Sequence, residues 1–405
     1  MKVLKIKAIV RTISITHKFD KDKLIAINTS DVENGIMHDG TLTAIEDLKG
    51  QFKKTVQKGD ILFSEIRPAN RRFALVTKDD CADYVVSTKL MVLRKYNNEV
   101  DLRYFYYCLT NQPFLDMLQR KAENGIGSFP QITFDLLSEY AFPVPSLSEQ
   151  EKIANIIFSL DHKIELNKQI NDNLEAMAKQ LYDYWFVQFD FPNEEGKPYK
   201  SSGGAMVWNE KLKREIPEGW NVANVFDELH VQYGFPFSTE LFTEEPTSIP
   251  VVRIRDILEN SVSAYSEEEV DEKYKLQKQD LLVGMDGNFH MNYWNDNVSY
   301  LNQRSVRLRA KSKSAVSIMQ AKYDIAPYIK AKELRAKGST VGHLSDKDLK
   351  ELFVLVSPNV DFRNKFNSIL AEIIENRCEM IELTKQRDEL LPLLMNGQAS
   401  VNYHL

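Results

Sequence analysis

Residues 146–185 read SLSEQEKIANIIFSLDHKIELNKQINDNLEAMAKQLYDYW and contain neither proline nor glycine. The stretch opens with Ser-x-x-Glu twice, Ser146 with Glu149 and Ser148 with Glu151, which is the spacing of a capping box at the start of a helix. Its apolar residues then recur at alternating steps of three and four, as on a helix that packs lengthwise against another helix. A helix of this length would extend roughly 60 Å, which is too long for one compact domain. We therefore expect a long helix that continues beyond a single globular part.

A second stretch with the same spacing, residues 358–397, closes the chain. The two stretches also align with each other, because Ile-Glu-Leu-x-Lys-Gln at 164–169 recurs 217 positions later at 381–386, and 136–145 aligns with 349–358 at an offset of 213. We expect the two helices to pair along a seam formed by Ile153, Ile157, Leu160, Ile164, Leu174, Leu181, Phe366, Ile369, Ile373, Met380, Leu383 and Leu390. The chain is thus predicted to be a globular segment and a long helix, repeated once.

Polar residues interrupt this predicted seam. Asn167 and Asn171 fall on it in the first helix, and Asn376 and Arg387 in the second. A polar residue in an apolar seam lowers stability but fixes the register of the pair. In the other interpretation the first helix is rotated, so that these asparagines face water and neighbouring apolar residues take the seam positions.

The rest of the chain predicts two mixed domains with the same order of elements. Residues 59–68 match 279–288, and both segments contain a strand; 90–95 match 305–311 in the same way. The predicted fold class is α+β, with two mixed α/β domains separated by two long antiparallel coiled-coil helices. The expected boundaries are 1–145 for the first domain, 146–192 for the first helix, 193–357 for the second domain with its linker, and 358–405 for the second helix.

Composition and charge restrict the class of protein. Hydrophobic residues make up 43% and charged residues 27% of the 405 residues, as in ordinary globular proteins. No apolar run is long enough to span a membrane, and three widely spaced cysteines predict a reducing compartment, so we expect a cytoplasmic location. The net charge of −6 argues against a strong nucleic-acid binder. However, the first 145 residues carry 21 basic and 18 acidic groups, so local basic clusters remain available.

Several motifs resemble the specificity (S) subunits of type I restriction–modification systems. They are residues 145–175, the run WFVQFDFP with GKPY and GG in 185–204, IPEGW at 216–220 and RDELLPLLMNGQ at 387–398. The resemblance covers nearly the whole chain, and the order of domain, helix, domain, helix is its most specific part. It implies two target recognition domains, each of which reads one half of a bipartite site in double-stranded DNA, with the paired helices setting the gap.

The resemblance also implies the partners of the chain. Two modification (methyltransferase) subunits, which bind S-adenosylmethionine, would dock on it, and restriction subunits would join the full complex. The S subunit itself would catalyse nothing and hold no cofactor or metal. A coiled-coil scaffold that binds proteins without DNA specificity is the alternative, and the acidic balance of the chain is compatible with it.

The candidate DNA-contacting residues lie in or beside loops that follow matched strands. Arginine offers two donors suited to guanine, and asparagine or glutamine offers an amide suited to adenine. The candidates are Arg67, Asn70, Arg71, Arg72, Arg253, Arg255, Asn288, His290, Asn292, Gln303 and Arg304. For each of them the second interpretation is a solvated surface charge or a structural amide.

An aromatic run follows the first predicted helix and has two interpretations. Tyr182, Tyr184, Trp185, Phe186 and Phe189 would either dock a modification subunit or pack the helix end onto a domain. Nearby, Asp190 with Glu195 and Lys197 loosely resembles a metal-dependent nuclease pattern. It lies in a stretch rich in proline and glycine, which would not hold carboxylates for a metal, so we interpret the pattern as chance.

Overall fold

The computed structural model describes residues 2–13, 21–48, 50–124, 130–336 and 342–395. The chain divides into two compact units, Met1–Ile164 with Glu382–Leu405 (unit 1) and Glu165–Ile381 (unit 2). Each long helix therefore contributes one part to each unit. Below, domain 1 is the globular part of unit 1 (residues 2–144) and domain 2 that of unit 2 (residues 206–356).

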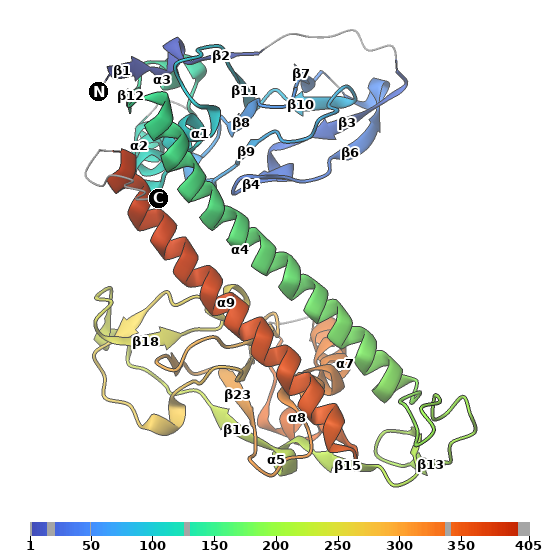
Figure 1. Cartoon of the computed structure of the whole chain (residues 1–405). Coiled ribbons are helices and arrows are strands. Elements are labelled where there is room, and N and C mark those ends of the chain that lie inside the picture. The colour runs from blue at the N-terminus through green and yellow to red at the C-terminus, as the bar shows by residue number, and fades with distance from the viewer. Residues whose placement is uncertain (1, 14–20, 49, 125–129, 337–341, 396–405) are drawn as a thin grey trace. The chain divides into compact units, whose positions relative to one another are not determined.

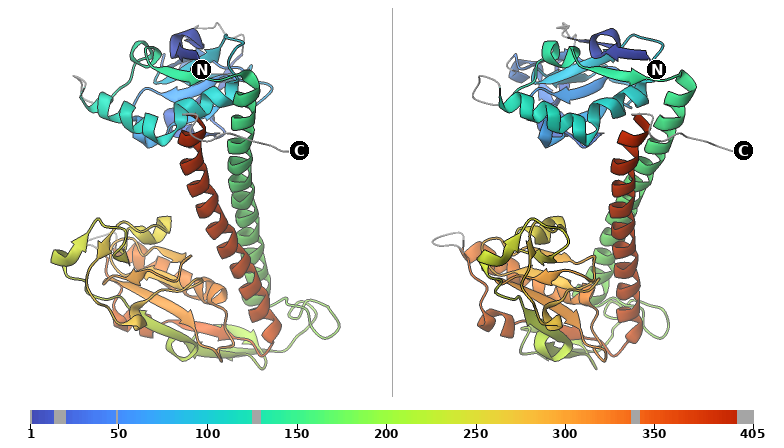
Figure 2. Two further views of the ribbon diagram at one scale, coloured as in Figure 1. Left: turned by 60° about the vertical axis from the view of Figure 1, so that its left-hand side comes forward. Right: turned by 90° about the vertical axis from the view of Figure 1, so that its left-hand side faces the viewer.

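Both predicted long helices are present (Figure 1). Helix α4 spans Leu147–Tyr182 and continues as one π-helical turn, Asp183–Val187; helix α9 spans Val360–Met395. Of the two predicted capping boxes, that of Ser146 and Glu149 starts α4, because the Glu149 carboxylate accepts from the Ser146 amide at 3.0 Å and the Glu149 amide donates to the Ser146 hydroxyl at 3.4 Å. Within each unit, α4 and α9 run antiparallel and side by side (Figure 2).

Domain 1 contains two four-stranded sheets. The first is antiparallel and has the order β2 (Val10–Thr12), β11 (Leu90–Lys95), β8 (Ile61–Ser64), β9 (Phe73–Leu75). The second has the order β6 (Thr41–Ala44), β3 (Lys23–Ile27), β10 (Tyr84–Ser87), β7 (Phe52–Thr55), and its β3–β10 pair is parallel. Two short pairs add β1 (Lys2–Lys5) to β12 (Ala141–Val144) and β4 (Val32–Glu33) to β5 (Ile36–Met37). The helices are α1 (Leu102–Thr110), α2 (Gln112–Glu123) and α3 (Phe134–Ser138).

Domain 2 repeats the first sheet, whereas the parallel pair of its second sheet lies at the edge instead of the centre. Its first sheet has the order β16 (Leu229–Tyr233), β23 (Ser305–Ala310), β20 (Leu281–Gly284), β21 (Met291–Tyr293). Its second has the order β17 (Phe242–Thr243), β19 (Tyr265–Ser266), β18 (Ile249–Val252), β22 (Tyr300–Leu301), with β18 and β22 parallel. β15 (Asn221–Asn224) pairs with β24 (Phe353–Val356), and β13 (Met206–Asn209) with β14 (Arg214–Pro217). The helices are α5 (Val225–Glu228), α6 (Asp256–Glu259), α7 (Ile318–Ala336) and α8 (Asp346–Lys350).

A buried carboxylate–guanidinium pair recurs at the same place in both domains. Asp60, just before β8, accepts two hydrogen bonds of 2.7 Å from Arg94 on β11. Asp280, just before β20, accepts two of 2.6 Å from Arg309 on β23. These fork-shaped bonds lock the same two strands together in each domain. The predicted match of 59–68 with 279–288 and of 90–95 with 305–311 is thereby confirmed in three dimensions.

The predicted seam is buried or half-buried within each unit. In unit 1, Ile153 and Ile157 of α4 share an apolar cluster with Leu391 and Leu394 of α9. In unit 2, the apolar cluster combines the end of α4 with Phe366, Ile369 and Ile373 of α9. Amphipathic spacing thus gives both helices an apolar face that is covered by the neighbouring helix and the domain.

The asparagines predicted to interrupt the apolar seam of the first helix are buried in it. Asn167 and Asn171 are only 5% and 7% exposed, whereas Leu166 is 46% exposed, so the rotated alternative is wrong. In unit 2 the Asn376 amide donates to Asn171 Oδ1 at 2.9 Å, and Asn171 Nδ2 donates to the Ile373 carbonyl at 3.2 Å. In unit 1, Arg387 donates to Asp161 at 2.9 Å. Such buried bonds are satisfied in one register, which fixes the pairing.

Candidate nucleic-acid interface

The loop after β8 in domain 1 carries four of the candidate residues. Pro68–Asn70 form a single 3-10 turn between two left-handed residues, Arg67 (φ 46°) and Arg71 (φ 53°). Two left-handed residues so close together turn the backbone sharply, which non-glycine residues adopt only at some cost. The turn leaves the side chains of Arg67 and Asn70 exposed.

The other two arginines of this loop are engaged with the protein. Arg71 Nε donates to Asn34 Oδ1 at 2.7 Å, and Nη1 donates to the Gln112 side chain. Burial is the main cause that lowers the pKa of Arg71, followed by the nearby charge of Arg387. Arg72 donates to the Ser30 carbonyl at 3.3 Å and lies 3.6 Å from the Glu33 carboxylate. In this conformation both arginines hold the loop in place.

In domain 2, one carboxylate organises the matching loop, residues 285–290. Asp286 lies 2.6 Å from His343 Nδ1 and accepts from Arg304 Nη1 at 2.5 Å. Hydrogen bonds from both partners hold the pKa of Asp286 below its ordinary value despite the opposing effect of burial. Arg304 has a φ of 65° and immediately precedes β23, so the cluster ties three segments together. Asn288 and Gln303 are exposed beside it, and His290 is half-buried.

The remaining candidates of domain 2 lie around α6. Arg253 donates to the Ser263 carbonyl at 2.7 Å and has its Nε 3.5 Å from Asp256. Asn292 donates to the Leu258 carbonyl at 2.9 Å and to the Ile257 carbonyl at 3.2 Å. These two side chains stabilise the local fold, whereas Arg255 is exposed. The structure thus separates the domain 2 candidates into a loop cluster (288, 290, 303, 304) and a group around α6 (253, 255, 292).

Both candidate loops are anchored by the segment that precedes the last short helix of their domain. The Arg67 amide donates to the Pro130 carbonyl at 3.0 Å, and the Gly287 amide donates to the Gly342 carbonyl at 2.9 Å. Isolated β-bridges join Ile66 to Gln131 and Asp286 to His343. The two domains therefore present these loops from the same position of the fold.

The aromatic run is mostly internal to unit 2. Trp185, Phe186 and Phe189 are buried in its apolar cluster, where Trp185 stacks on Phe362 at 4.5 Å between ring centroids. Tyr182 is also buried and donates to Asp324. These four rings pack the end of α4 onto the unit, which favours the packing interpretation for them. Tyr184 is 38% exposed, so a partner contact there remains a prediction.

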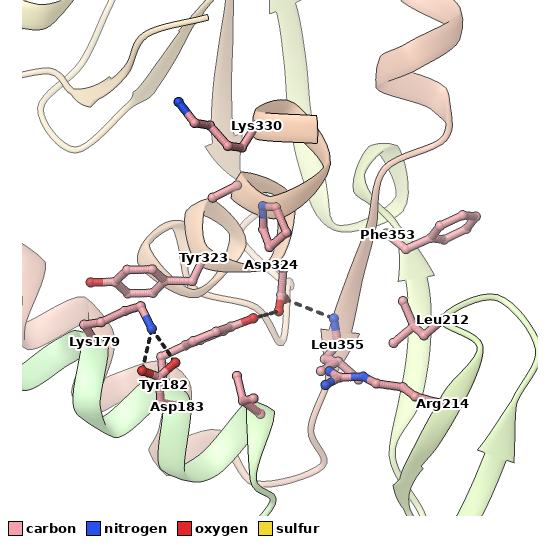
Figure 3. A pocket seen from close by; sticks show the side chains of 13 residues that line it. Lys179, Tyr182, Asp183, Leu212, Arg214, Tyr323, Asp324, Lys330, Phe353 and Leu355 are labelled. Carbon is pink, nitrogen blue, oxygen red and sulfur yellow. Dashed lines mark hydrogen bonds and ion pairs between the residues drawn. The ribbon is translucent and has the colours of Figure 1, made fainter. Parts of the chain in front are cut away.

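A cavity of about 620 Å³ lies beside this helix end (Figure 3). Its walls come from α4, the β13–β14 hairpin, α7 and β24, and Asp324 lies on the α7 side. The Asp324 carboxylate accepts from the Tyr182 hydroxyl at 2.8 Å and from the Leu355 amide at 3.1 Å. Burial raises its pKa to about 6 against these donors. We interpret Asp324 as a structural acceptor that joins α7 to α4 and β24.

The nuclease-like residues have local partners. Asp190 accepts from the amide and the hydroxyl of Ser201, both at 2.7 Å, and Glu195 pairs with Lys197 at 2.9 Å. Within the described part of the chain, no group of three or more His, Cys, Asp or Glu side chains is arranged to hold a metal ion. In the same residues, no helix is long and apolar enough to cross a membrane.

The buried Asp–Arg pairs and the contact between α9 and domain 2 were not identified from the sequence. The Asp60–Arg94 and Asp280–Arg309 pairs were detectable, because aspartate and arginine recur at equal positions of the matched segments. The contact of Arg377 on α9 with Asn292, at 3.1 Å, had no signal in the sequence, because the two residues are 85 positions apart.

Comparisons with known proteins agree with this architecture. A family model described as the type I restriction modification DNA specificity domain matches twice, at residues 9–176 and 217–392. The specificity subunit of the type I restriction enzyme MjaIX of Methanocaldococcus jannaschii is 28% identical over 313 residues, which cover 74% of this chain and 69% of that subunit. The HindI specificity subunit of Haemophilus influenzae is 42% identical over 180 residues, 44% of this chain and only 39% of that subunit.

A solved structure supports the fold. The S subunit of a type I restriction–modification system from M. genitalium superposes with a TM-score of 0.55 at 15% identity, over 97% of this chain and 96% of that one. The predicted fold class of mixed domains with long helices is thereby confirmed. Because the family model covers most of the residues in two copies, the chain belongs to the family of type I restriction–modification specificity subunits.

Proposed function

We propose that each domain reads one half of a bipartite sequence in double-stranded DNA and that the paired helices set the gap between the halves. The observation that carries this proposal is the internal repeat: two domains share one framework, including the buried Asp–Arg pair, but differ in the loops that the framework presents. A shared framework with different loops is suited to reading two different sequences from equivalent positions.

The proposal assigns catalysis to partners. Two modification subunits, which bind S-adenosylmethionine, dock on the helices and methylate the site, and restriction subunits complete the complex. In this proposal the chain itself catalyses nothing and holds no cofactor. Its contribution is affinity and specificity, which require a fixed geometry rather than reactive groups.

The decisive test is methylation by the chain together with its modification subunits on a library of random DNA. We expect methylation at one bipartite sequence with a single gap length, read by sequencing that detects methylated bases. A protein scaffold without DNA specificity, the second candidate, would leave methylation independent of sequence or absent.

The role of the helices is tested separately by insertion. Four residues added after Asn171, about one helical turn, should change the preferred gap and leave both half-sites as they were. Altered half-sites at an unchanged gap would contradict the spacing role.

A further inference from the structure

We infer that Arg377 is a positioning residue that fixes the orientation of domain 2 on the helix pair and thereby sets how strictly the gap is enforced. This inference rests on the proposed function. It concerns contacts inside unit 2 alone, and it assigns Arg377 no contact with DNA.

One guanidinium connects both helices to the domain. Arg377 on α9 donates through Nη2 to Glu175 of α4 at 2.9 Å and through Nη1 to Asn292 Oδ1 of β21 at 3.1 Å. The Asn292 amide in turn donates to the carbonyls of Ile257 and Leu258 in α6. The helix pair, the edge strand β21 and α6 therefore form one hydrogen-bonded chain.

The hydrogen bonds of Arg377 restrain the orientation of domain 2 on α9, which the adjacent apolar contact does not. Leu370, Ile373 and Ile374 of α9 pack in the apolar cluster of unit 2, and hydrophobic contact is largely insensitive to small rotations. Hydrogen bonds to a charged group weaken steeply when their angles change. Arg377 lies about one helical turn beyond Ile373, so it restrains domain 2 against rocking on this apolar surface.

Arg377 has no equivalent in unit 1, where a different guanidinium contacts α4: Arg103 of α1 donates to Asn155 Oδ1 at 2.8 Å. By the two offsets of the internal repeat, the residue of α4 equivalent to Arg377 is Leu160 or Ile164. Neither side chain can form such hydrogen bonds. Domain 1 is joined to α4 through the buried Gln150, which accepts from the Asp101 amide at 2.8 Å and donates to the Glu99 carbonyl at 3.0 Å. A loss of Arg377 should therefore loosen one domain and leave the other in place.

The test is the gap profile of methylation by the complex of the full chain with its modification subunits. The DNA substrates carry the wild-type half-sites at the native gap and at gaps one base pair shorter and longer. For Arg377→Ala we expect the ratio of methylation at the native gap to that at the altered gaps to fall about tenfold, the scale of losing a charge-assisted hydrogen-bond network. The bases recognised in each half should not change.

Two variants separate positioning from stability. Arg377→Lys keeps the charge but cannot span both acceptors, so its profile should be intermediate. Ile325→Val removes one buried methyl group from α7 in the same unit and should lower methylation equally at all gaps.

Each other outcome counts against the inference. A wild-type gap profile for Arg377→Ala overturns it, and so does an equal broadening by Ile325→Val, which would make gap selection a matter of general stability. If the wild-type complex methylates no bipartite sequence, the proposed function fails, and the inference fails with it.

Discussion

Domains 1 and 2 share their framework and differ in their loops. In both, the strand that follows the buried aspartate lies in the sheet between the arginine-bearing strand and an edge strand, and a parallel strand pair lies in the second sheet. The loop after this strand has eight residues in domain 1 (65–72) and six in domain 2 (285–290). The first is held by arginines that bond to distant segments, the second by one aspartate. The framework thus determines where a loop is presented, and the loop determines the chemistry presented there.

The largest effect should come from breaking the shared framework. Asp60→Ala and Asp280→Ala each remove the carboxylate partner of a mostly buried arginine, so we expect each to lower the free energy of unfolding by about 3 kcal/mol. Urea unfolding followed by circular dichroism measures this loss. Asp79→Ala, which breaks an exposed pair with Lys58, should cost less than about 1 kcal/mol.

The comparison depends on both aspartates having the same effect. If only one substitution destabilised the protein, the two pairs would not be equivalent, and the framework would be less alike than its geometry indicates. Methylation should fall with each substitution to the extent that the destabilised domain unfolds, since an unfolded domain cannot present its loop.

The order of domains and long helices along the chain was predictable, because it follows from the helical periodicity of the apolar residues and from the internal repeat. The steps of three and four defined both helices, and the polar seam positions of Asn167 and Asn171 followed from the same count. The sequence did not predict which loop side chains are exposed and which are hydrogen-bonded within the protein. Arg72 and Asn292 bond to carbonyls that come from elsewhere in the chain, and only the tertiary fold brings these groups together. The sequence located the loops but did not separate their structural residues from their exposed ones.

A smaller effect should distinguish the loops themselves. Asn70 and Asn288 are exposed amides in the loops after β8 and β20. If each reads one half-site, Asn70→Ala and Asn288→Ala should each reduce discrimination at one half about tenfold and leave the other half unchanged. Methylation of substrates with single base changes in either half measures this. Asn364→Ala, at an exposed position on α9, is the matched control and should change neither.

An equal loss at both halves for either loop variant would contradict the assignment of one half-site to each domain. No change for both variants would exclude these amides as base contacts and turn attention to Arg255 and Gln303, which are also exposed.

The smallest effect concerns one buried position at which the two units carry different groups. Cys108 in α1 and Asp324 in α7 are both the seventh residue after their helix caps, Asp101 and Ser317. Burial raises the pKa of both side chains, that of Asp324 to about 6. The cysteine therefore stays neutral over the range in which the aspartate titrates. Only unit 2 carries an acid at this point.

The sign of the pH effect follows from that shift. Because its pKa is higher in the folded than in the unfolded chain, Asp324 contributes stability that is fully present below about pH 4 and is lost as the pH rises through 6. Between pH 7 and pH 5 the wild type should gain about 1 kcal/mol relative to Asp324→Asn, measured by urea unfolding at both values. Cys108→Ser should retain the wild-type pH dependence. If Asp324→Asn retained it as well, other carboxylates would dominate the titration, and the two helices would be alike in this respect despite their different residues.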